Sequence, residues 1–424
     1  MIDIQSLRAN PEAIRENLRR RQVNNVDLDR LLALDQDRSR LIQELDVIRQ
    51  ERNQIADQVS KATPADRPAL ITRGKELKET IAAEEPALEA VEKEWKELLS
   101  LIPNHTHPET PTGVSDEENV EIKVSGEEQT FSFQPKSHTE LAKQLDLIDF
   151  DRGAKVAGAK FYFLKGKLVL LEQALIQWVL KELVAEGFTP IETPDVAKEE
   201  IMAGTGFNPR GSEDQIYTLT GTDLSLVATA EIPVGGYFKD EILEAKDLPL
   251  RFVALSHCFR KEAGAYGKES YGLYRVHQFT KVEMFIFATP EQSEGLHQEL
   301  RRLEERIFTK LGLRYRVVDI CTGDLGGPAY RKYDLEAWMW GKGDGKGGWG
   351  EVTSTSNCTD YQARRLNIRY RKEDGGVELI HTLNGTALAL SRALITILEQ
   401  YQEEDGSIRV PEVLQPFCGF DRIN

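Results

Sequence analysis

The sequence has no long hydrophobic run and few cysteines, and each shortage excludes a class of protein. No stretch approaches the roughly 18 consecutive apolar residues typical of a membrane-spanning helix, so we expect no membrane association. The four cysteines lie far apart without a C-x-x-C pair, which argues against a zinc ribbon or a disulfide scaffold. The N-terminus lacks a basic segment followed by an apolar stretch, so no secretory signal is expected. These absences predict a reducing, cytoplasmic compartment.

A surplus of positive charge is also missing. The chain of 424 residues carries 54 Lys and Arg against 70 Asp and Glu, a net charge of −16. Such a balance lowers the expectation of a nucleic-acid partner, because phosphate neutralisation needs clustered cations. Local basic patches can still exist, and the length allows two or three domains.

The first hundred residues are nearly free of aromatic residues and glycine, with Trp95 and Gly74 as single examples. A helix start is indicated at Asn10 and Pro11, where a capping residue precedes Pro at the first helical position. Apolar residues then recur every seven positions, in the series Leu34, Leu41, Ile48, Ile55 and, after a Pro-containing segment at 63–68, in the series Ile81, Leu88, Trp95, Ile102.

This spacing predicts two amphipathic helices that fold back on each other as an antiparallel coiled coil. Arg38, Arg52 and Glu84 interrupt the apolar series, so the seam is imperfect. Each helix should have about 35 residues and a length of about 50 Å.

The arm as a whole is acidic, but its outer part is basic. From position 49 to 78 there are seven basic and four acidic residues. The seven basic residues are candidates for binding the phosphates of an RNA backbone: Arg49, Arg52, Lys61, Arg67, Arg73, Lys75 and Lys78. The run from Arg15 to Arg21 is a second candidate. A rigid spacer or a dimerisation rod with solvated helix faces would look similar.

After the predicted coiled coil the composition and the pattern of the sequence change. We expect an N-terminal domain at 1–105, a Pro-containing acidic linker at 106–137 with a short strand at 120–124, and a larger domain at 138–424. Strands are predicted at 252–255, 282–287 and 315–320, and helices at 168–186, 292–311 and 388–402. Strands and helices do not alternate regularly, and no G-x-G-x-x-G or P-loop pattern occurs, which favours an α+β fold with an antiparallel sheet.

Arg260 and Glu262 form the first candidate site. On an extended strand the two side chains would share a face. A fixed guanidinium beside a carboxylate suits a polyphosphate with a metal or a ribose hydroxyl nearby, although a surface ion pair is the simpler interpretation of these residues alone.

Around these residues the chain resembles the class II aminoacyl-tRNA synthetases. The run 259–262, with Arg275 and Phe279, resembles their motif 2, the segment 187–194 their motif 1, and the segment 383–394 with Arg392 their motif 3. Within the class, the long arm and the stretches 229–231, 275–283 and 356–365 resemble the bacterial seryl-tRNA synthetases over essentially the whole chain. The resemblance implies an antiparallel sheet flanked by helices for 138–424 and a tRNA-binding role for 1–105.

The resemblance implies an ATP site. Arg260 should contact the α-phosphate, Glu262 the adenine side, and Arg392 the bent triphosphate. Glu351 and Ser354 should bind Mg²⁺ and phosphate. The remaining ATP-binding candidates implied are Lys261, Val276, Val352 and Thr353.

The resemblance also implies a serine site and a reaction. Thr229 and Glu231 should receive the α-ammonium group, and Ala230 between them is also a serine-binding candidate. Glu283 and Thr386 should meet the hydroxyl, and Asn384 should help to position that pocket. The implied activity is the ATP-dependent joining of L-serine to tRNA(Ser), and also to tRNA(Sec), by a homodimer. Two alternatives stay open: a non-catalytic tRNA-binding relative, which would more simply have lost one of these site residues, and a ligase that charges a carrier protein, which would lack the arm.

Overall fold

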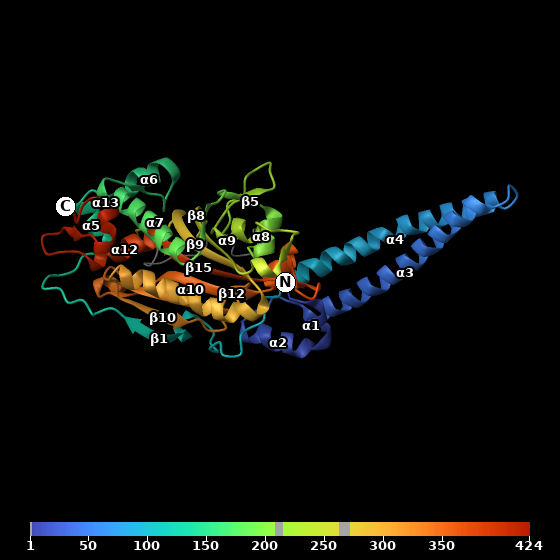
Figure 1. Cartoon of the computed structure of the whole chain (residues 1–424), viewed down its shortest axis with the longest axis horizontal. Helices are drawn as coiled ribbons and strands as arrows, with labels where there is room; N and C mark the ends of the chain where they lie inside the picture. The colour runs from blue at the N-terminus through green and yellow to red at the C-terminus, as the bar shows by residue number, and fades with distance from the viewer. Residues whose placement is uncertain (1, 208–214, 263–271) are drawn as a thin grey trace. The chain divides into compact units, whose positions relative to one another are not determined.

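The computed structural model describes residues 2–207, 215–262 and 272–424, with the backbone alone at residue 344. The chain divides into two compact units, Met1–Pro103 and Asn104–Asn424 (Figure 1). In the ranges described, no helix is both long and apolar enough to span a bilayer.

The first unit contains the predicted helical hairpin. Helices α3 (Leu28–Lys61) and α4 (Arg67–Leu101) have 34 and 35 residues and run side by side over their whole length (Figure 1). The turn at 62–66 contains Pro64, and Pro68 lies in the first turn of α4, where its missing N–H costs no hydrogen bond. The coiled-coil prediction is confirmed.

The apolar seam of the hairpin is only partly buried. Leu41, Leu45, Leu77 and Ile81 are buried, whereas Ile48, Ile55 and Val59 of α3 and Leu88 of α4 are half-buried. Arg38, which interrupts the apolar series, has a partner for its charge. Its Nε lies 3.1 Å from Glu92 Oε1, and its guanidinium lies over the ring of Trp95, 4.9 Å from the ring centre.

Two short helices complete this unit. The side chain of Asn10 caps α2 (Pro11–Arg20) by accepting a hydrogen bond from the Ala13 N–H at 3.1 Å, as predicted, and α1 (Ile4–Ala9) precedes it. Buried residues of this segment form one apolar cluster with the start of α3 and the end of α4, at the base of the hairpin: Ile2, Leu7, Ile14, Leu18, Leu28, Leu31, Leu99 and Ile102.

The second unit is organised around an eight-stranded sheet, which confirms the predicted α+β class. Neighbouring strands are antiparallel except for the pair β4 and β8. The strand order is β1 (Val120–Ser125), β10 (Tyr315–Asp319), β11 (Arg331–Met339), β12 (Gly348–Thr359), β15 (His381–Ala389), β9 (Gln278–Ala288), β8 (Leu250–Phe259) and β4 (Thr189–Glu192).

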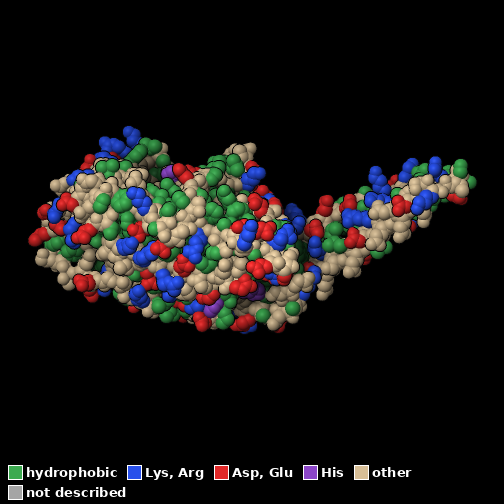
Figure 2. All heavy atoms as spheres, viewed as in Figure 1, with side chains coloured by type: hydrophobic (Ala, Val, Ile, Leu, Met, Phe, Trp, Pro, Cys, Tyr) green, Lys and Arg blue, Asp and Glu red, His purple; other side chains and the backbone are tan. Residues whose placement is uncertain are grey.

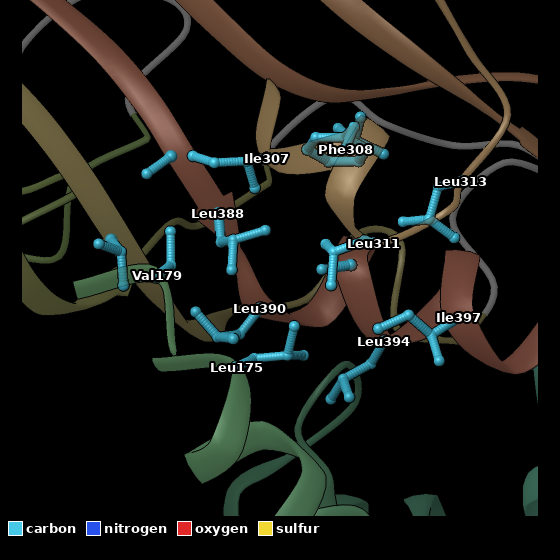
Figure 3. Close-up of a cluster of buried hydrophobic side chains, with 14 of the residues drawn as sticks. Leu175, Val179, Ile307, Phe308, Leu311, Leu313, Leu388, Leu390, Leu394 and Ile397 are labelled. Atoms are coloured by element: carbon cyan, nitrogen blue, oxygen red, sulfur yellow. The ribbon is translucent and has the colours of Figure 1, made fainter. Parts of the chain in front are cut away.

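One face of the sheet packs against three long helices, close to the helices predicted: α7 (Lys167–Ala185), α10 (Pro290–Lys310) and α12 (Leu390–Gln400). Helix α12 begins two residues later than predicted because β15 continues to Ala389. Figure 3 shows Leu175 of α7, Ile307 and Phe308 of α10 and Leu394 of α12 close together in the main core. Strand alternation sends Met284 and Ile286 of β9 into this core and turns Lys281 and Glu283 to the opposite face.

The opposite face is covered over only part of its area. At one end an apolar cluster that includes Phe252, Phe285 and Phe287 packs against α9 (Glu231–Gly235) and α11 (Tyr361–Leu366), together with a small sheet of β7 (Ile242–Glu244), β13 (Arg369–Arg371) and β14 (Val377–Leu379). The rest of this face holds a cavity.

Short elements connect these parts. They are α5 (His138–Gln144), α6 (Phe150–Ala157), α8 (Glu199–Thr205) and α13 (Gln415–Cys418), with the strand pairs β2 (Ile148–Asp149) and β3 (Phe163–Leu164), β5 (Val196–Lys198) and β6 (Leu224–Leu226), and β16 (Ile408–Arg409) and β17 (Arg422–Ile423). Single 3₁₀ turns lie at Asp116–Glu118, Ala245–Asp247, Gly343–Gly345 and Glu412–Leu414.

Candidate active site

The second unit contains a cavity of about 580 Å³ on the sheet face opposite α10. It brings together thirteen of the fifteen residues predicted to bind ATP or serine: Thr229, Glu231, Arg260, Glu262, Val276, Glu283, Glu351, Val352, Thr353, Ser354, Asn384, Thr386 and Arg392. Ala230 and Lys261 do not line it. The side chain of Ala230 packs in the apolar cluster beneath α9, and the Lys261 N–H donates to the Gln215 carbonyl at 2.9 Å.

Arg260 and Glu262 meet in the cavity for a reason other than strand alternation. Strand β8 ends at Phe259, and Glu262 has a φ of 50°, so the prediction that both lie on one extended strand is wrong. Contacts hold them instead. Arg260 Nε donates to the Ala228 carbonyl at 3.3 Å, and Arg275 Nη1 donates to Glu262 Oε2 at 2.6 Å.

Arg392 reaches the same cavity from the first turn of α12. Its Nη1 donates to the Glu351 carbonyl and lies 3.0 Å from Glu351 Oε1. The ring of Tyr274 lies 4.8 Å from its guanidinium. Burial by itself would raise the pKa of Glu351, but the charges of Arg392, Lys332 and Arg260 outweigh it and hold that pKa below its usual range. The cavity therefore keeps an ionised carboxylate among several cations.

A β-bulge places Glu351 and Ser354 on one face. The pairing of β11 with β12 shifts between Leu335 and Glu336, so that Val352 is an extra residue in β12. In a regular strand, residues 351 and 354 would point to opposite faces, whereas both line the cavity here. A carboxylate and a hydroxyl are hard oxygen ligands that suit Mg²⁺ completed by phosphate oxygens. No group of three or more His, Cys, Asp or Glu side chains suited to a metal occurs in the described ranges.

Three polar side chains form a tight group at the inner end of the cavity. Lys281 Nζ forms an ion pair with the Glu283 carboxylate and donates to Thr229 Oγ1 at 3.2 Å. Thr229 Oγ1 in turn donates to Glu283 Oε2 at 3.4 Å. The other carboxylate oxygen, Glu283 Oε1, is buried without a hydrogen-bond partner in the described part of the chain. An unpaired buried acceptor is costly, so this oxygen is a place for a ligand donor.

Glu231 lies beside this group at the start of α9. Its Oε1 accepts hydrogen bonds from Gln362 Nε2 at 2.6 Å and from Asn384 Nδ2 at 3.0 Å. Burial and the charge of Glu283 raise the pKa of Glu231 to about 7, although Lys281, Gln362 and Arg260 act in the other direction. A cation bound next to Glu231 would stabilise its ionised form, which burial and Glu283 disfavour.

Sequence reasoning missed several residues near these side chains. Lys332 and Asp334 alternate on β11 and form an ion pair at 3.0 Å, and Lys332 lines the cavity. Burial and Glu351 raise the pKa of Asp334, against the effect of Lys332. The alternation of Lys and Asp around Tyr333 was a signal for a strand with one charged face.

A buried pair also connects the cavity wall to distant segments. His138 Nδ1 lies 2.7 Å from Glu399 Oε1, and the Leu273 N–H donates to His138 Nε2 at 3.2 Å. Glu399 Oε2 accepts from the Gly341 N–H at 2.9 Å. Leu273 precedes Tyr274, which lines the cavity. No local sequence pattern marks this pair, because its members lie 261 positions apart.

The predicted RNA-binding cations on the hairpin differ in their surroundings. Arg49 lies 3.0 Å from Glu85, Arg73 lies 2.7 Å from Glu51, and Arg52 donates to Asn53 at 3.2 Å. Within the described residues, Lys61, Arg67, Lys75 and Lys78 are exposed and have no ion pair. Figure 2 shows basic and acidic side chains interspersed along the hairpin.

Comparisons with known proteins agree for both units. Residues 1–106 match the family described as the seryl-tRNA synthetase N-terminal domain, and residues 217–401 match the class II tRNA synthetase core domain (G, H, P, S and T). The serine–tRNA ligase of Treponema denticola is 54% identical over 100% of both chains. That of Dictyoglomus thermophilum is also 54% identical, over 100% of this chain and 99% of its own.

Solved structures show the same relationship. The seryl-tRNA synthetase of Pyrococcus horikoshii complexed with ATP superposes with a TM-score of 0.89 at 41% identity, covering 100% of this chain and 99% of its own. The cytoplasmic serine-tRNA ligase of Naegleria fowleri in complex with AMP has a TM-score of 0.83 at 34% identity, with coverages of 98% and 96%.

Proposed function

The chain belongs to the seryl-tRNA synthetase family, and from this premise we propose that it activates L-serine with ATP and transfers the serine to the 3′ end of tRNA(Ser). One observation carries the proposal: Arg260, Glu351 and Arg392, which are far apart in the sequence, line one cavity together with five of the six serine-site candidates. The cavity therefore contains groups for a triphosphate and for a small zwitterion.

In the first step, a serine carboxylate oxygen attacks the α-phosphorus of ATP and pyrophosphate leaves. Such an in-line displacement needs placement and charge stabilisation rather than a protein nucleophile. Arg260 stabilises the charge on the α-phosphate, and Arg392 holds the phosphates that leave. Glu262, held by Arg275, contacts the adenine side.

Glu351 and Ser354 are the residues that would hold Mg²⁺. They fit the ion because the bulge in β12 aims two oxygen ligands into the cavity and leaves other positions to phosphate. When bound, the ion neutralises phosphate charge. Arg392 and Lys332 supply fixed positive charge on the same side without it.

Serine is recognised by two groups of side chains. Glu231 and Thr229 receive the α-ammonium, and Asn384 orients Glu231. The serine hydroxyl donates to Glu283 Oε1, which lacks a partner in the described residues, and Thr386 lies in the same part of the cavity. Alanine would leave that buried oxygen unpaired, which a site of this kind rejects strongly.

In the second step, a terminal ribose hydroxyl of the tRNA attacks the seryl carbonyl, and AMP leaves. We propose that the hairpin binds the tRNA through phosphates, chiefly with the exposed cations Lys61, Arg67, Lys75 and Lys78. The same surface would serve tRNA(Sec), which the family resemblance also implies.

We further propose that the enzyme is a cytoplasmic homodimer. Large hydrophobic side chains are exposed on α6, β3 and α7, and such side chains fit a subunit interface: Val156, Phe163, Val169 and Leu170. Sedimentation equilibrium at micromolar concentration should give twice the chain mass of 47.9 kDa. A single species at the chain mass would contradict the dimer.

The activation step is tested by exchange of radiolabelled pyrophosphate into ATP. We expect exchange with L-serine and Mg²⁺ and very little with L-alanine. Folded protein that shows no serine-dependent exchange would rule out the enzyme and favour the non-catalytic relative.

The arm is tested by deleting residues 39–91 and joining Arg38 to Glu92 through a short Gly-Ser linker. These two side chains lie 3.1 Å apart across the hairpin, and the deletion keeps the apolar cluster at its base. Exchange should be unchanged, whereas charging of tRNA(Ser) should be lost. Charging that survives the deletion would refute the role of the arm, and exchange without tRNA charging by the intact chain would favour the carrier-protein ligase.

A further inference from the structure

A buried glutamine lies directly behind Glu231. Gln362 belongs to α11, has no exposed surface and does not line the cavity. None of the roles assigned above uses it, yet its side chain is fixed by three hydrogen bonds.

The orientation of the Gln362 amide follows from its partners. Nε2 donates to Glu231 Oε1 at 2.6 Å and to the Thr205 carbonyl at 3.0 Å, while Oε1 accepts from Thr382 Oγ1 at 2.7 Å. A carboxylate and a carbonyl can only accept, so the atom that faces both must be the nitrogen. The amide therefore presents a donor to Glu231 and cannot rotate to present its oxygen without losing both bonds.

This donor acts on one oxygen of Glu231. Asn384 Nδ2 donates to the same Oε1 at 3.0 Å. With two donors on Oε1, the plane of the carboxylate is set, and Oε2 accepts no hydrogen bond from the described residues. The carboxylate has one anchored oxygen and one oxygen left for a ligand.

We propose that Gln362 is a positioning residue for serine, which holds the Glu231 carboxylate in the orientation that receives the α-ammonium group. The proposal rests on the proposed function, because it assigns that ammonium to Glu231. It adds a residue that touches neither substrate and that acts on one substrate only.

The charge of Glu231 gives a second readout. Glu283 and Lys281 from β9 and Arg260 after β8 are the charged groups that face it. Burial and Glu283 raise the pKa of Glu231 to about 7, and the Gln362 hydrogen bond counteracts this rise. The KM for serine should increase as pH falls through this pKa, because a protonated Glu231 no longer attracts a cation. Without the Gln362 donor the pKa should be higher, so the increase should begin at a higher pH.

The test is Gln362→Met in the full chain, assayed by pyrophosphate exchange. Methionine keeps the approximate volume and removes both donors. We expect the KM for serine to rise at least about 10-fold, the range for losing a hydrogen bond to a charged group, and the KM for ATP to change less than about twofold. The acid limb of the serine KM profile should move to higher pH.

Gln400→Met is the matched control. Gln400 is equally buried and also makes three hydrogen bonds, to the Arg314 N–H and to the Arg314 and Trp338 carbonyls, but does not line the cavity. It should lose comparable thermal stability and leave the serine KM and its pH profile unchanged. This control separates selective positioning from general loosening of the fold.

If Gln362→Met does not fold, Thr382→Val removes the hydroxyl that fixes the Gln362 oxygen and should raise the serine KM about threefold, with a smaller pH shift in the same direction. Equal increases in both KM values, an unchanged serine KM, or a serine effect in Gln400→Met would overturn the proposal. Absence of serine-dependent exchange in the wild-type chain would instead refute the proposed function.

Discussion

In the hairpin of the first unit and in the sheet of the second, the residues that contact each other are separated along the chain in different ways. In the hairpin, ion pairs join positions that mirror each other about the turn, such as Arg30 with Glu94 and Arg49 with Glu85. In the sheet unit, the cavity gathers residues from position 206 to position 392. A periodic pattern can determine the first arrangement, whereas the second needs the complete topology.

The two regions also use charge differently. Ion pairs on the hairpin are largely exposed and contribute little each, so cations there can be replaced without loss of the fold. In the cavity, Glu231, Glu283 and Glu351 are held close to buried or half-buried cations, where removal of one partner leaves an uncompensated charge. We therefore expect substitutions in the cavity to have large effects and equivalent ones in the hairpin to have small effects.

The largest effect is expected for Arg392→Ala. Loss of the guanidinium that contacts Glu351 and holds the leaving phosphates should reduce pyrophosphate exchange about 100- to 1000-fold. Arg38→Ala is the comparison in the hairpin, because it also removes a paired and ring-covered arginine. Exchange by that variant should equal wild type. Similar losses in the two variants would show that the regions are not independent.

A smaller effect is expected at His138. His138→Asn keeps an amide near the position of Nδ1 but loses the acceptor for the Leu273 N–H, so Tyr274 is less well held against Arg392. We expect the KM for ATP to rise about 10-fold, the cost of an unpaired buried N–H. His138→Gln can place an oxygen near Nε2 and should remain within about threefold of wild type. A Gln variant as impaired as the Asn variant would count against this role.

The hairpin cations should have a moderate effect on tRNA alone. Lys75→Gln with Lys78→Gln removes two exposed cations and should raise the KM for tRNA(Ser) roughly 3- to 10-fold at low salt, with a shallower salt dependence. Exchange should not change. Arg40→Gln, which alters a cation paired with Glu44 outside the 49–78 segment, is the control and should leave both assays near wild type. A larger effect in the control would show that the tRNA contacts the part of the hairpin nearer its base rather than the segment 49–78.

The smallest effect concerns one glycine in each region. A Cβ on Gly74 of α4 would lie 3.7 Å from Ile55 Cγ2, an ordinary contact, so Gly74→Ala should stabilise the hairpin locally by about 0.5–1 kcal/mol. Amide hydrogen exchange around residue 74 should slow about two- to fivefold. Gly385→Ala in β15 should have the opposite sign, because its Cβ would lie 3.1 Å from both Glu304 Oε1 and Thr355 Oγ1. Equal signs would show that backbone entropy dominates at both sites.

The sequence predicted most of the secondary structure and much of the candidate site. The heptads of the hairpin, the alternating strands and the amphipathic helices each arise from residues that are close in sequence, so their patterns can be read directly. The resemblance to a family identified the residues that lie far apart in the sequence, and all of the predicted ATP- and serine-binding residues except Ala230 and Lys261 line the cavity. Whether the residues it collected act as assigned stays a prediction for the assays above.

By itself, then, the sequence determined a helical hairpin, an α+β unit and the chemical groups available to the site. Only the tertiary structure decided which of those groups meet: the bulge at Val352 that turns Glu351 and Ser354 to one face, the left-handed φ of Glu262, and the hydrogen bond from Gln362 to Glu231. The physical reason is that local periodicity sets the direction of a side chain along one element. The residue that this side chain contacts depends on strand register and on helix packing between segments that can lie more than a hundred residues apart.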